Sequence, residues 1–395
     1  MRAVTWHGIE DVRVEEVPDP RIQQPTDAIV RVTSTAICGS DLHLYKVLAP
    51  YLQPGDILGH EFMGIVEEVG SGVDNLAVGD RVVVPFNISC GSCWMCDRKL
   101  YAQCETTQNR DLGRGAGLFG YTSMYGAVPG GQAERVRVPH ADFGPIKLDG
   151  DLPDERYLYL SDILPTAWQG VKYADVPEGG SLLVLGLGPV GLMAVRAARQ
   201  MGIETIVGVD LERPRLDAAA ALGATVLDYE AEDDIPAAVR DLTSGRGADG
   251  VLDAVGMESH GSPVSERVIG AASRLPKPAA RAAIEHAGID RLAALHLAID
   301  CARRAGTVSV SGVYGGAMSP MPLMDIFDKG LTLRHGQCHV RAWTDELHRL
   351  AKDPSDPLEL EGFATHPGVP LDNAPEMYET FQKKQDGCIK VILQP

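Results

Sequence analysis

The apolar residues of the chain follow one pattern in its first part and another in its middle part. In the first 150 residues they form short β-like runs, at 1–8, 11–17, 27–38, 63–70 and 80–85, and glycines and prolines separate these runs. Short apolar runs bounded by turn residues are typical of β-strands. This part of the sequence therefore predicts a β-rich, barrel-like lobe.

From about residue 165 to 315 strand patterns alternate with helix patterns. The apolar runs lie at 181–188, 205–210, 225–229, 250–256 and 306–312, and helical segments such as 189–202 and 213–223 lie between them. Buried runs of this kind predict a parallel sheet that is covered by helices on both faces. Residues 257–298 are too many for one strand–helix link, so we expect an inserted loop there. The tail ends in a further strand within 388–395.

Composition narrows the class of protein. A chain of 395 residues with 45% hydrophobic and 23% charged residues is typical of a globular protein with more than one domain. The formal net charge of −18 argues against a nucleic-acid partner or an acidic membrane surface. No targeting segment and no apolar stretch of ~18 residues is found, so we expect a cytoplasmic protein with reduced thiols.

Four of the eight cysteines lie close together, at Cys90, Cys93, Cys96 and Cys104. In a reducing compartment a disulfide knot is disfavoured. The spacing fits a tetrahedral zinc site of four thiolates, whereas iron–sulfur clusters, which also take four cysteines, use other spacings. Because such a zinc has no open ligand position, we expect it to stabilise a lobe and to take no part in chemistry.

A dinucleotide site is indicated by the motif G-x-G-x-x-G. The motif follows an apolar strand and opens a helix, and Asp210 comes nineteen residues after its last glycine, close to the interval of ~20 found in dinucleotide-binding folds. The turn glycines and the helix N-terminus would bind the pyrophosphate. Asp210 favours NAD over NADP, although Arg213 and Arg215 offer the alternative of holding a 2′-phosphate. The predicted cofactor contacts in this motif are Gly186, Gly188, Pro189, Val190 and Gly191.

A second set of metal ligands is suggested by "TAICGSDLH" at 35–43 and "GHEFMGIVEEVGSGV" at 59–73. Taken alone, Cys38 is more often a buried thiol, and His60 a hydrogen-bonded histidine, than a metal ligand. Together with the cysteine cage and the glycine-rich turn, these segments resemble the zinc-containing medium-chain dehydrogenases over nearly the whole chain. The resemblance implies an α/β protein with a GroES-like domain at 1–165 and 317–395, and a Rossmann domain at 166–316.

The resemblance also implies a catalytic zinc with Cys38, His60 and Asp162 as ligands. Many members have cysteine as the third ligand, and Asp162 within "LSDILPT" is similar to the glutathione-independent formaldehyde dehydrogenase and aldehyde dismutase branch. The loop after 256 and the segment "GGQAERVRVPHADF" agree with that branch, and the loop's length and later sequence depart from it. Three ligands leave one position for an alcohol or water oxygen.

Further roles follow from the resemblance alone. Ser40 matches the hydroxyl that accepts the substrate proton, and His43 the imidazole that passes the proton to solvent. Asp41 matches the carboxylate that orients His60, and Glu61 a temporary zinc ligand.

For the cofactor, the resemblance implies that Thr166 lies near the nicotinamide and that Lys390 reaches the pyrophosphate. Apart from the resemblance, Val255 should line the adenosine side because it lies at the carboxyl end of the fourth strand of the nucleotide sheet, and Arg215 is a cofactor candidate because it lies near Asp210.

The sequence thus predicts an oxidoreductase with two zinc ions per chain and NAD. It would transfer a hydride between NAD and a small alcohol or an aldehyde hydrate such as that of formaldehyde. The alternative within the class is a general alcohol or polyol dehydrogenase that exchanges its NAD freely. A non-enzymatic, zinc-stabilised binding protein is the alternative from another class. The resemblance implies a homo-oligomer, with a tetramer as the first expectation and a dimer as the second.

Overall fold

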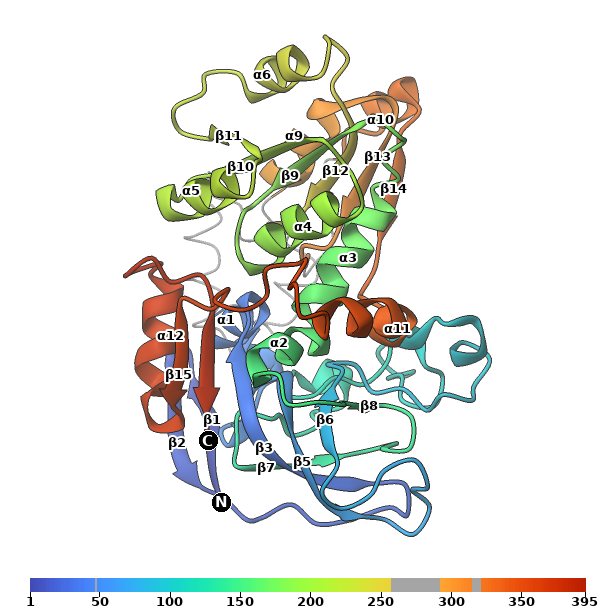
Figure 1. Ribbon diagram of the computed structural model, residues 1–395, viewed down its shortest axis with the longest axis vertical. Coiled ribbons are helices and arrows are strands. Elements are labelled where there is room, and N and C mark those ends of the chain that lie inside the picture. Colours follow the sequence, from blue (N-terminus) through green and yellow to red (C-terminus); the bar gives the residue numbers. More distant parts are fainter. Residues whose placement is uncertain (47, 257–291, 315–320) are drawn as a thin grey trace. The chain divides into compact units, whose positions relative to one another are not determined.

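The computed structural model describes residues 1–46, 48–256, 292–314 and 321–395, which divide into two compact units (Figure 1). Unit 1 comprises Met1–Pro165 and Cys338–Pro395, and unit 2 comprises Thr166–Gln337. Most of the predicted inserted loop at 257–298 lies outside the described residues. Its described end, 292–298, enters a helix.

Unit 1 is β-rich, as its sequence pattern predicts. A seven-stranded sheet has the order β15-β16-β3-β5-β6-β8, with β7 paired to β3, and a three-stranded sheet has the order β2-β1-β4. Valines, alanines and phenylalanines from the larger sheet form the core, because alternate side chains of its strands point to one face. The strands are β1 (Arg2–Gly8), β2 (Asp11–Glu16), β3 (Ala28–Ile37), β4 (Asp56–Ile57), β5 (Glu61–Val69), β6 (Arg81–Val84), β7 (Arg135–Val138), β8 (Ile146–Lys147), β15 (His366–Pro370) and β16 (Val391–Gln394).

Helices of unit 1 connect or flank these strands. They are α1 (Gly39–Lys46), α2 (Asp154–Leu158), α11 (Val340–Ala351) and α12 (Ala374–Gln382). The helix α3 (Ile163–Tyr173) begins in unit 1 and continues into unit 2.

Unit 2 is a parallel six-stranded sheet of order β11-β10-β9-β12-β13-β14. Counted from its first strand this is the order 3-2-1-4-5-6, which is typical of the Rossmann fold. The strands are β9 (Ser181–Leu185), β10 (Thr205–Asp210), β11 (Thr225–Asp228), β12 (Ala248–Asp253), β13 (Ala302–Val310) and β14 (Thr332–His335). The helices are α4 (Pro189–Gln200), α5 (Arg213–Ala221), α6 (Ile235–Leu242), α9 (Ala293–Cys301) and α10 (Leu323–Lys329). The predicted fold class, a β-rich GroES-like lobe and a Rossmann sheet, is confirmed.

Unit 2 continues to Gln337, beyond the predicted limit of 316. The reason is β14, which pairs in parallel with β13 and so completes the Rossmann sheet. Three of its four residues are exposed. An edge strand of this kind has no buried apolar run to reveal it in the sequence.

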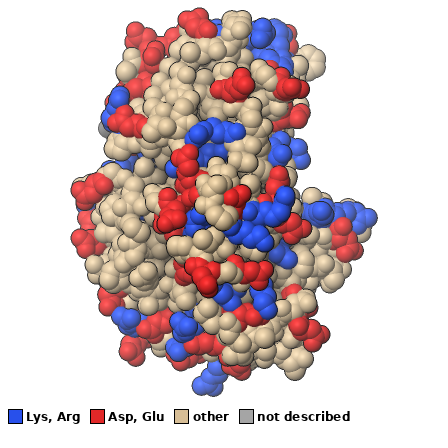
Figure 2. Space-filling model, in the orientation of Figure 1, with Lys and Arg blue, Asp and Glu red and all other residues tan. Residues whose placement is uncertain are grey.

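Charges are distributed as the composition suggests. Figure 2 shows acidic side chains spread over the visible face, with basic side chains between them. Within the described residues, no helix has the length and apolar character that a membrane span requires.

Candidate functional site

The register of two paired strands brings the first predicted ligands together. Cys38 directly follows β3, and His60 directly precedes β5. These strands pair antiparallel with Ala36 opposite Glu61, so residues 38 and 60 lie at the same end of the pair. Gly59 has φ +95°, a left-handed conformation that glycine adopts readily, and this turn directs the chain into His60.

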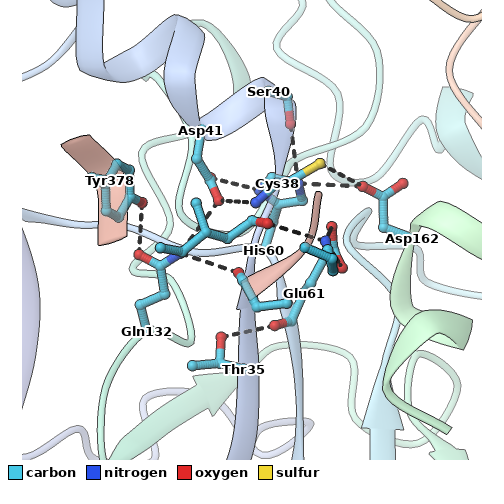
Figure 3. Close-up of polar contacts among 12 residues, drawn as sticks. Thr35, Cys38, Ser40, Asp41, His60, Glu61, Gln132, Asp162 and Tyr378 are labelled. Carbon is cyan, nitrogen blue, oxygen red and sulfur yellow. Dashed lines mark hydrogen bonds and ion pairs between the residues drawn. The ribbon is translucent and has the colours of Figure 1, made fainter. Parts of the chain in front are cut away.

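Asp162, which lies just before α3, completes the cluster (Figure 3). Its Oδ2 lies 3.5 Å from Sγ of Cys38 and 3.3 Å from Nε2 of His60. The Oγ of Ser40 lies 3.1 Å from the same Nε2. One donor atom from each of Cys38, His60, Glu61 and Asp162 can be chosen so that all four lie within 4.8 Å of one another. The structure therefore brings the three predicted zinc ligands together in a buried pocket of donor atoms.

The other nitrogen of His60 is held by Asp41. Oδ1 of this fully buried aspartate lies 3.0 Å from Nδ1 of the imidazole. Its Oδ2 accepts the backbone N–H of Cys38 at 2.9 Å. This arrangement favours the tautomer with the proton on Nδ1, which leaves the Nε2 lone pair facing the donor cluster.

The chemistry of the donor set fits zinc. Burial and the charges of Glu61 and Asp162 raise the pKa of the Cys38 thiol to about 11. Burial lowers the pKa of His60, but Asp41 and Asp162 outweigh it and raise that pKa well above its usual value. A bound divalent cation would offset this excess of negative charge, and thiolate, imidazole and carboxylate are all ligands of zinc.

Two residues that the sequence reasoning did not single out extend the Asp41 contact. Gln132 donates from Nε2 to Oδ2 of Asp41 at 3.3 Å and to the carbonyl of Ala36 at 3.2 Å. The hydroxyl of Tyr378, on α12, donates to Oε1 of Gln132 at 2.8 Å (Figure 3). The only signal in the sequence is the glycine pair before Gln132, which indicates close backbone packing, and nothing indicates Tyr378.

Lys390 is placed differently from its prediction. The register that sets Val391 opposite Ile37 keeps it within unit 1. Its fully buried Nζ lies 2.7 Å from both carboxylate oxygens of Glu61. Burial lowers the pKa of Lys390, but the Glu61 charge outweighs it and raises that pKa above its usual value. The ammonium group therefore pairs with Glu61 in this structure, whereas the sequence prediction is a contact with a cofactor pyrophosphate.

The predicted proton relay is only partly assembled. Ser40 is half-buried and lies on the donor cluster. His43 lies in the same helix, α1, but its side chain is only 6% exposed. In this structure its ring does not open directly to solvent.

The four cysteines of the predicted cage also come together. Their sulfur atoms lie within 4.8 Å of one another, and none of the four forms a disulfide. Burial opposes ionisation of Cys90, but hydrogen bonds from the Thr106 hydroxyl and from the Ser92 backbone lower the pKa of its thiol to about 6. Four cysteine sulfurs gathered in this way are suitable ligands for a structural zinc, and the fourth sulfur would close its coordination.

In unit 2 the glycine-rich turn has the predicted geometry. Gly186 has φ +82°, and a Cβ on Gly191 would lie 1.9 Å from the carbonyl oxygen of Gly186. A Cβ on Gly188 would meet nothing closer than Nη1 of Arg215, at 3.7 Å. Gly191 is therefore needed for helix–strand packing, whereas a Cβ on Gly188, at the N-terminus of α4, would make only an ordinary contact with the Arg215 guanidinium. Pro189 and Val190 follow as the first residues of that helix.

Asp210 ends β10, as predicted, and its carboxylate organises the turn. Its Oδ2 accepts the backbone N–H of Leu187 at 2.6 Å, and its Oδ1 accepts those of Leu211 and Glu212 at 2.7 and 2.9 Å. Arg215 lies 3.8 Å from the same carboxylate. The contact with Leu187 places the charge of Asp210 beside Gly188.

The last two predicted cofactor residues lie in unit 2. Val255 follows β12, and its Cγ2 would lie 2.6 Å from a Cβ on Gly186, so it packs directly against the turn. Thr166 is half-buried in α3, at the first position of the unit. Apart from Lys390 and the buried His43, the predicted residues occupy positions compatible with their predicted roles.

Comparison with known proteins gives matches over both units. Residues 24–148 match the family model described as the alcohol dehydrogenase GroES-like domain, and residues 189–266 match that of the zinc-binding dehydrogenases. The uncharacterized zinc-type alcohol dehydrogenase-like protein AdhB of Bacillus subtilis is 40% identical over 100% of both chains. Formaldehyde dismutase of Pseudomonas putida is 33% identical over 100% of this chain and 97% of its own.

A solved structure with high similarity is that of the alcohol dehydrogenase TADH from Thermus sp. ATN1. It superimposes with a TM-score of 0.83 at 38% sequence identity, and the match covers 100% of this chain and 99% of that chain. The similarity therefore extends to the fold as well as to the sequence.

Proposed function

The chain belongs to the zinc-type medium-chain alcohol dehydrogenase family of oxidoreductases, and we propose that it transfers a hydride between NAD and a small alcohol or hydrated small aldehyde. The observation that carries the proposal is the cluster of Cys38, His60 and Asp162 with the Ser40 hydroxyl 3.1 Å from the imidazole. When bound, zinc acts as a Lewis acid toward the substrate oxygen, and NAD accepts the hydride.

The residues around the metal supply orientation and a proton path. Asp41 holds the imidazole of His60 from behind, so the ring keeps one orientation toward the metal. Ser40 takes the proton of the substrate hydroxyl and passes its own proton on. His43 is the proposed next proton acceptor along α1. Because His43 is buried, either a movement of this region or a water molecule must complete the proton path to solvent.

Two substrate classes suit this site. An alcohol RCH₂OH would give an aldehyde, NADH and a proton, and a hydrated aldehyde RCH(OH)₂ would give a carboxylic acid, NADH and a proton. Asp162 as third ligand and the similarity to formaldehyde dismutase over 97% of its chain favour the hydrate. The higher identities to AdhB and to TADH favour an alcohol.

Metal analysis and a substrate panel test the proposal. We expect about two zinc ions per purified chain, one for each donor cluster, and NADH formation from formaldehyde or from primary alcohols. Fast release of NADH with a preference for longer alcohols would support the alcohol class. Oxidation of formaldehyde by a chain that retains its NAD would support the hydrate class.

Matched variants assign the two metals. Asp162→Asn should lose one zinc and lower kcat/KM by ~100-fold or more with little change in Tm, because second-shell changes alone cost 10–100-fold. Cys93→Ser should lose the other zinc and lower Tm, because the cage ties down its lobe. A fully active protein with a single zinc, or loss of neither metal in Asp162→Asn, would contradict this assignment.

A further inference from the structure

Lys390 and Glu61 form a buried ion pair beside the candidate zinc site. Both side chains have 0% exposure. The Nζ of Lys390 lies 2.7 Å from each carboxylate oxygen of Glu61 and 3.1 Å from the carbonyl oxygen of Ile37. An ammonium group has three N–H donors, so these three acceptors satisfy all of them.

Glu61 is itself within reach of the metal. Its carboxylate is one of four donors whose atoms lie within 4.8 Å of one another, together with Cys38, His60 and Asp162. A zinc with four protein ligands is closed, as in the cysteine cage, whereas a catalytic zinc has three and an open position. Movement of one carboxylate would therefore convert this site from an open to a closed one.

We propose that Lys390 is a positioning residue that holds Glu61 away from the metal and so keeps the fourth ligand position free for the substrate. The inference rests on the proposed zinc-dependent function. To bind the metal through one oxygen, Glu61 would lose at least one of its two charge-assisted hydrogen bonds and leave the buried ammonium ion less well neutralised. Because Ile37 directly precedes Cys38, the third hydrogen bond also fixes the strand end that presents the thiolate.

A purely structural role for the pair would produce some of the same effects. Lys390 directly precedes β16, and Glu61 begins β5, so the ion pair also joins these strands through β3. Removing it would lower stability in either case. The decisive measurement must therefore report the number of ligands on the metal.

Cobalt in place of the catalytic zinc provides that measurement. The full chain is prepared with zinc in the cage and Co²⁺ at the Cys38 cluster, and imidazole is titrated while the visible absorption of Co²⁺ is recorded. Wild type should bind imidazole at the open position. Lys390→Met should retain its cobalt, show a changed spectrum before any addition, and need about 10–100-fold more imidazole, the range found when partners of metal ligands are removed.

Two further variants separate positioning from support of the fold. Lys390→Met combined with Glu61→Leu removes the competing carboxylate and should restore the imidazole response, which a structural role does not predict. Arg156→Met removes another buried cation of unit 1, which is bonded to the carbonyls of Ala351 and Asp353. It should lower Tm and leave the imidazole response unchanged.

The proposal would be overturned if the Lys390→Met variant had the same cobalt spectrum and the same imidazole affinity as the wild-type protein. Failure of that variant to fold with metal present would also overturn it, because a Glu61 bound to metal is no longer an unpaired charge. The titration needs no turnover. A wild-type chain that binds cobalt and imidazole but reduces no NAD would therefore remove the proposed function and leave the role of Lys390 standing.

Discussion

Gln132 joins the C-terminal helix α12 to the carboxylate that orients His60. Its side-chain amide contacts Asp41 at 3.3 Å and accepts the Tyr378 hydroxyl at 2.8 Å, and all three residues are buried. Buried polar groups in such a chain depend on one another, because a lost partner leaves a group unsatisfied. At the scale of single residues, the metal site therefore extends beyond its ligands.

We predict that Gln132→Leu lowers metal affinity at the Cys38 cluster by about 10–100-fold. The reason is that Asp41 loses one of the two hydrogen bonds to its Oδ2 that fix its orientation toward His60, and retains only that from the Cys38 backbone. Competition with a zinc-binding dye would measure the affinity. Tyr378→Phe is the matched control, because it keeps the contact of Gln132 with Asp41 and should change affinity much less. Equal effects of the two variants would mean that only general stability is involved.

We expect cofactor choice to depend on one residue, Asp210. We predict that Asp210→Asn lowers the ratio of kcat/KM for NAD to that for NADP by about tenfold or more, equivalent to ~1.4 kcal/mol. The charge that repels a 2′-phosphate is lost, while one oxygen remains to accept a backbone N–H of the turn. Initial rates with both cofactors test this. If the wild-type protein prefers NADP, this prediction is wrong, and Arg215 would instead bind the 2′-phosphate of that cofactor.

At the scale of elements, the turn between β9 and α4 contains glycines with different structural roles. A Cβ on Gly191 would lie 1.9 Å from a backbone oxygen, whereas a Cβ on Gly188 would meet nothing closer than Nη1 of Arg215, at 3.7 Å. The first prevents a steric clash between helix and strand. The second leaves room for a ligand at a helix N-terminus, where backbone N–H groups bind phosphates.

Alanine at these two positions should therefore have opposite consequences. Gly191→Ala should lower Tm by about 5–10 °C, because overpacking costs ~1–3 kcal/mol or more and unit 2 is a domain of moderate size. Gly188→Ala should leave Tm nearly unchanged and weaken NADH binding by about tenfold or more, since its Cβ would occupy the phosphate position. Calorimetry and NADH fluorescence measure the two effects. Normal NADH binding by Gly188→Ala would rule out this turn as the phosphate site.

At the scale of the whole molecule, the pH dependence of stability depends on how folding changes the pKa values of the histidines. Burial lowers the pKa of both His140 and His348 below the usual value of 6.5. In the folded chain they remain neutral at a pH where the unfolded chain binds protons. Their contribution is therefore fully present above pH 6.5 and is lost as the pH falls through the window below it.

We predict that Tm falls between pH 7 and pH 5.5, and that His140→Asn with His348→Gln reduces this fall. Asparagine suits position 140, where φ is +50°. Each histidine should account for only about 1–2 °C, because solvent screens half-buried groups. Zinc content must be measured at every pH, since loss of metal would also lower Tm. An unchanged pH slope in the double variant would refute the prediction.

Local features of the sequence were sufficient for much of this protein. The change from short β-like runs to alternating strands and helices predicted two units and a parallel sheet covered by helices, because the period of burial depends on neighbouring residues. The resemblance implied the Rossmann fold. The cysteine spacing determined the cage, and the glycine-rich motif determined the turn. The resemblance implied Cys38, His60 and Asp162 as ligands, and the structure brings these residues together.

Contacts between distant segments were decided only by the tertiary structure. Pairing of β16 with β3 places Lys390 on Glu61, although 329 residues separate them, and no local pattern encodes that register. The same holds for the contact of Tyr378 with Gln132. It also holds for β14, which joins the sheet by pairing with β13 and by the packing of its one half-buried side chain, Leu333. The sequence shows which side chains could bind a ligand. Strand register and buried charge pairing, which depend on the whole fold, decide which of these side chains face the ligand.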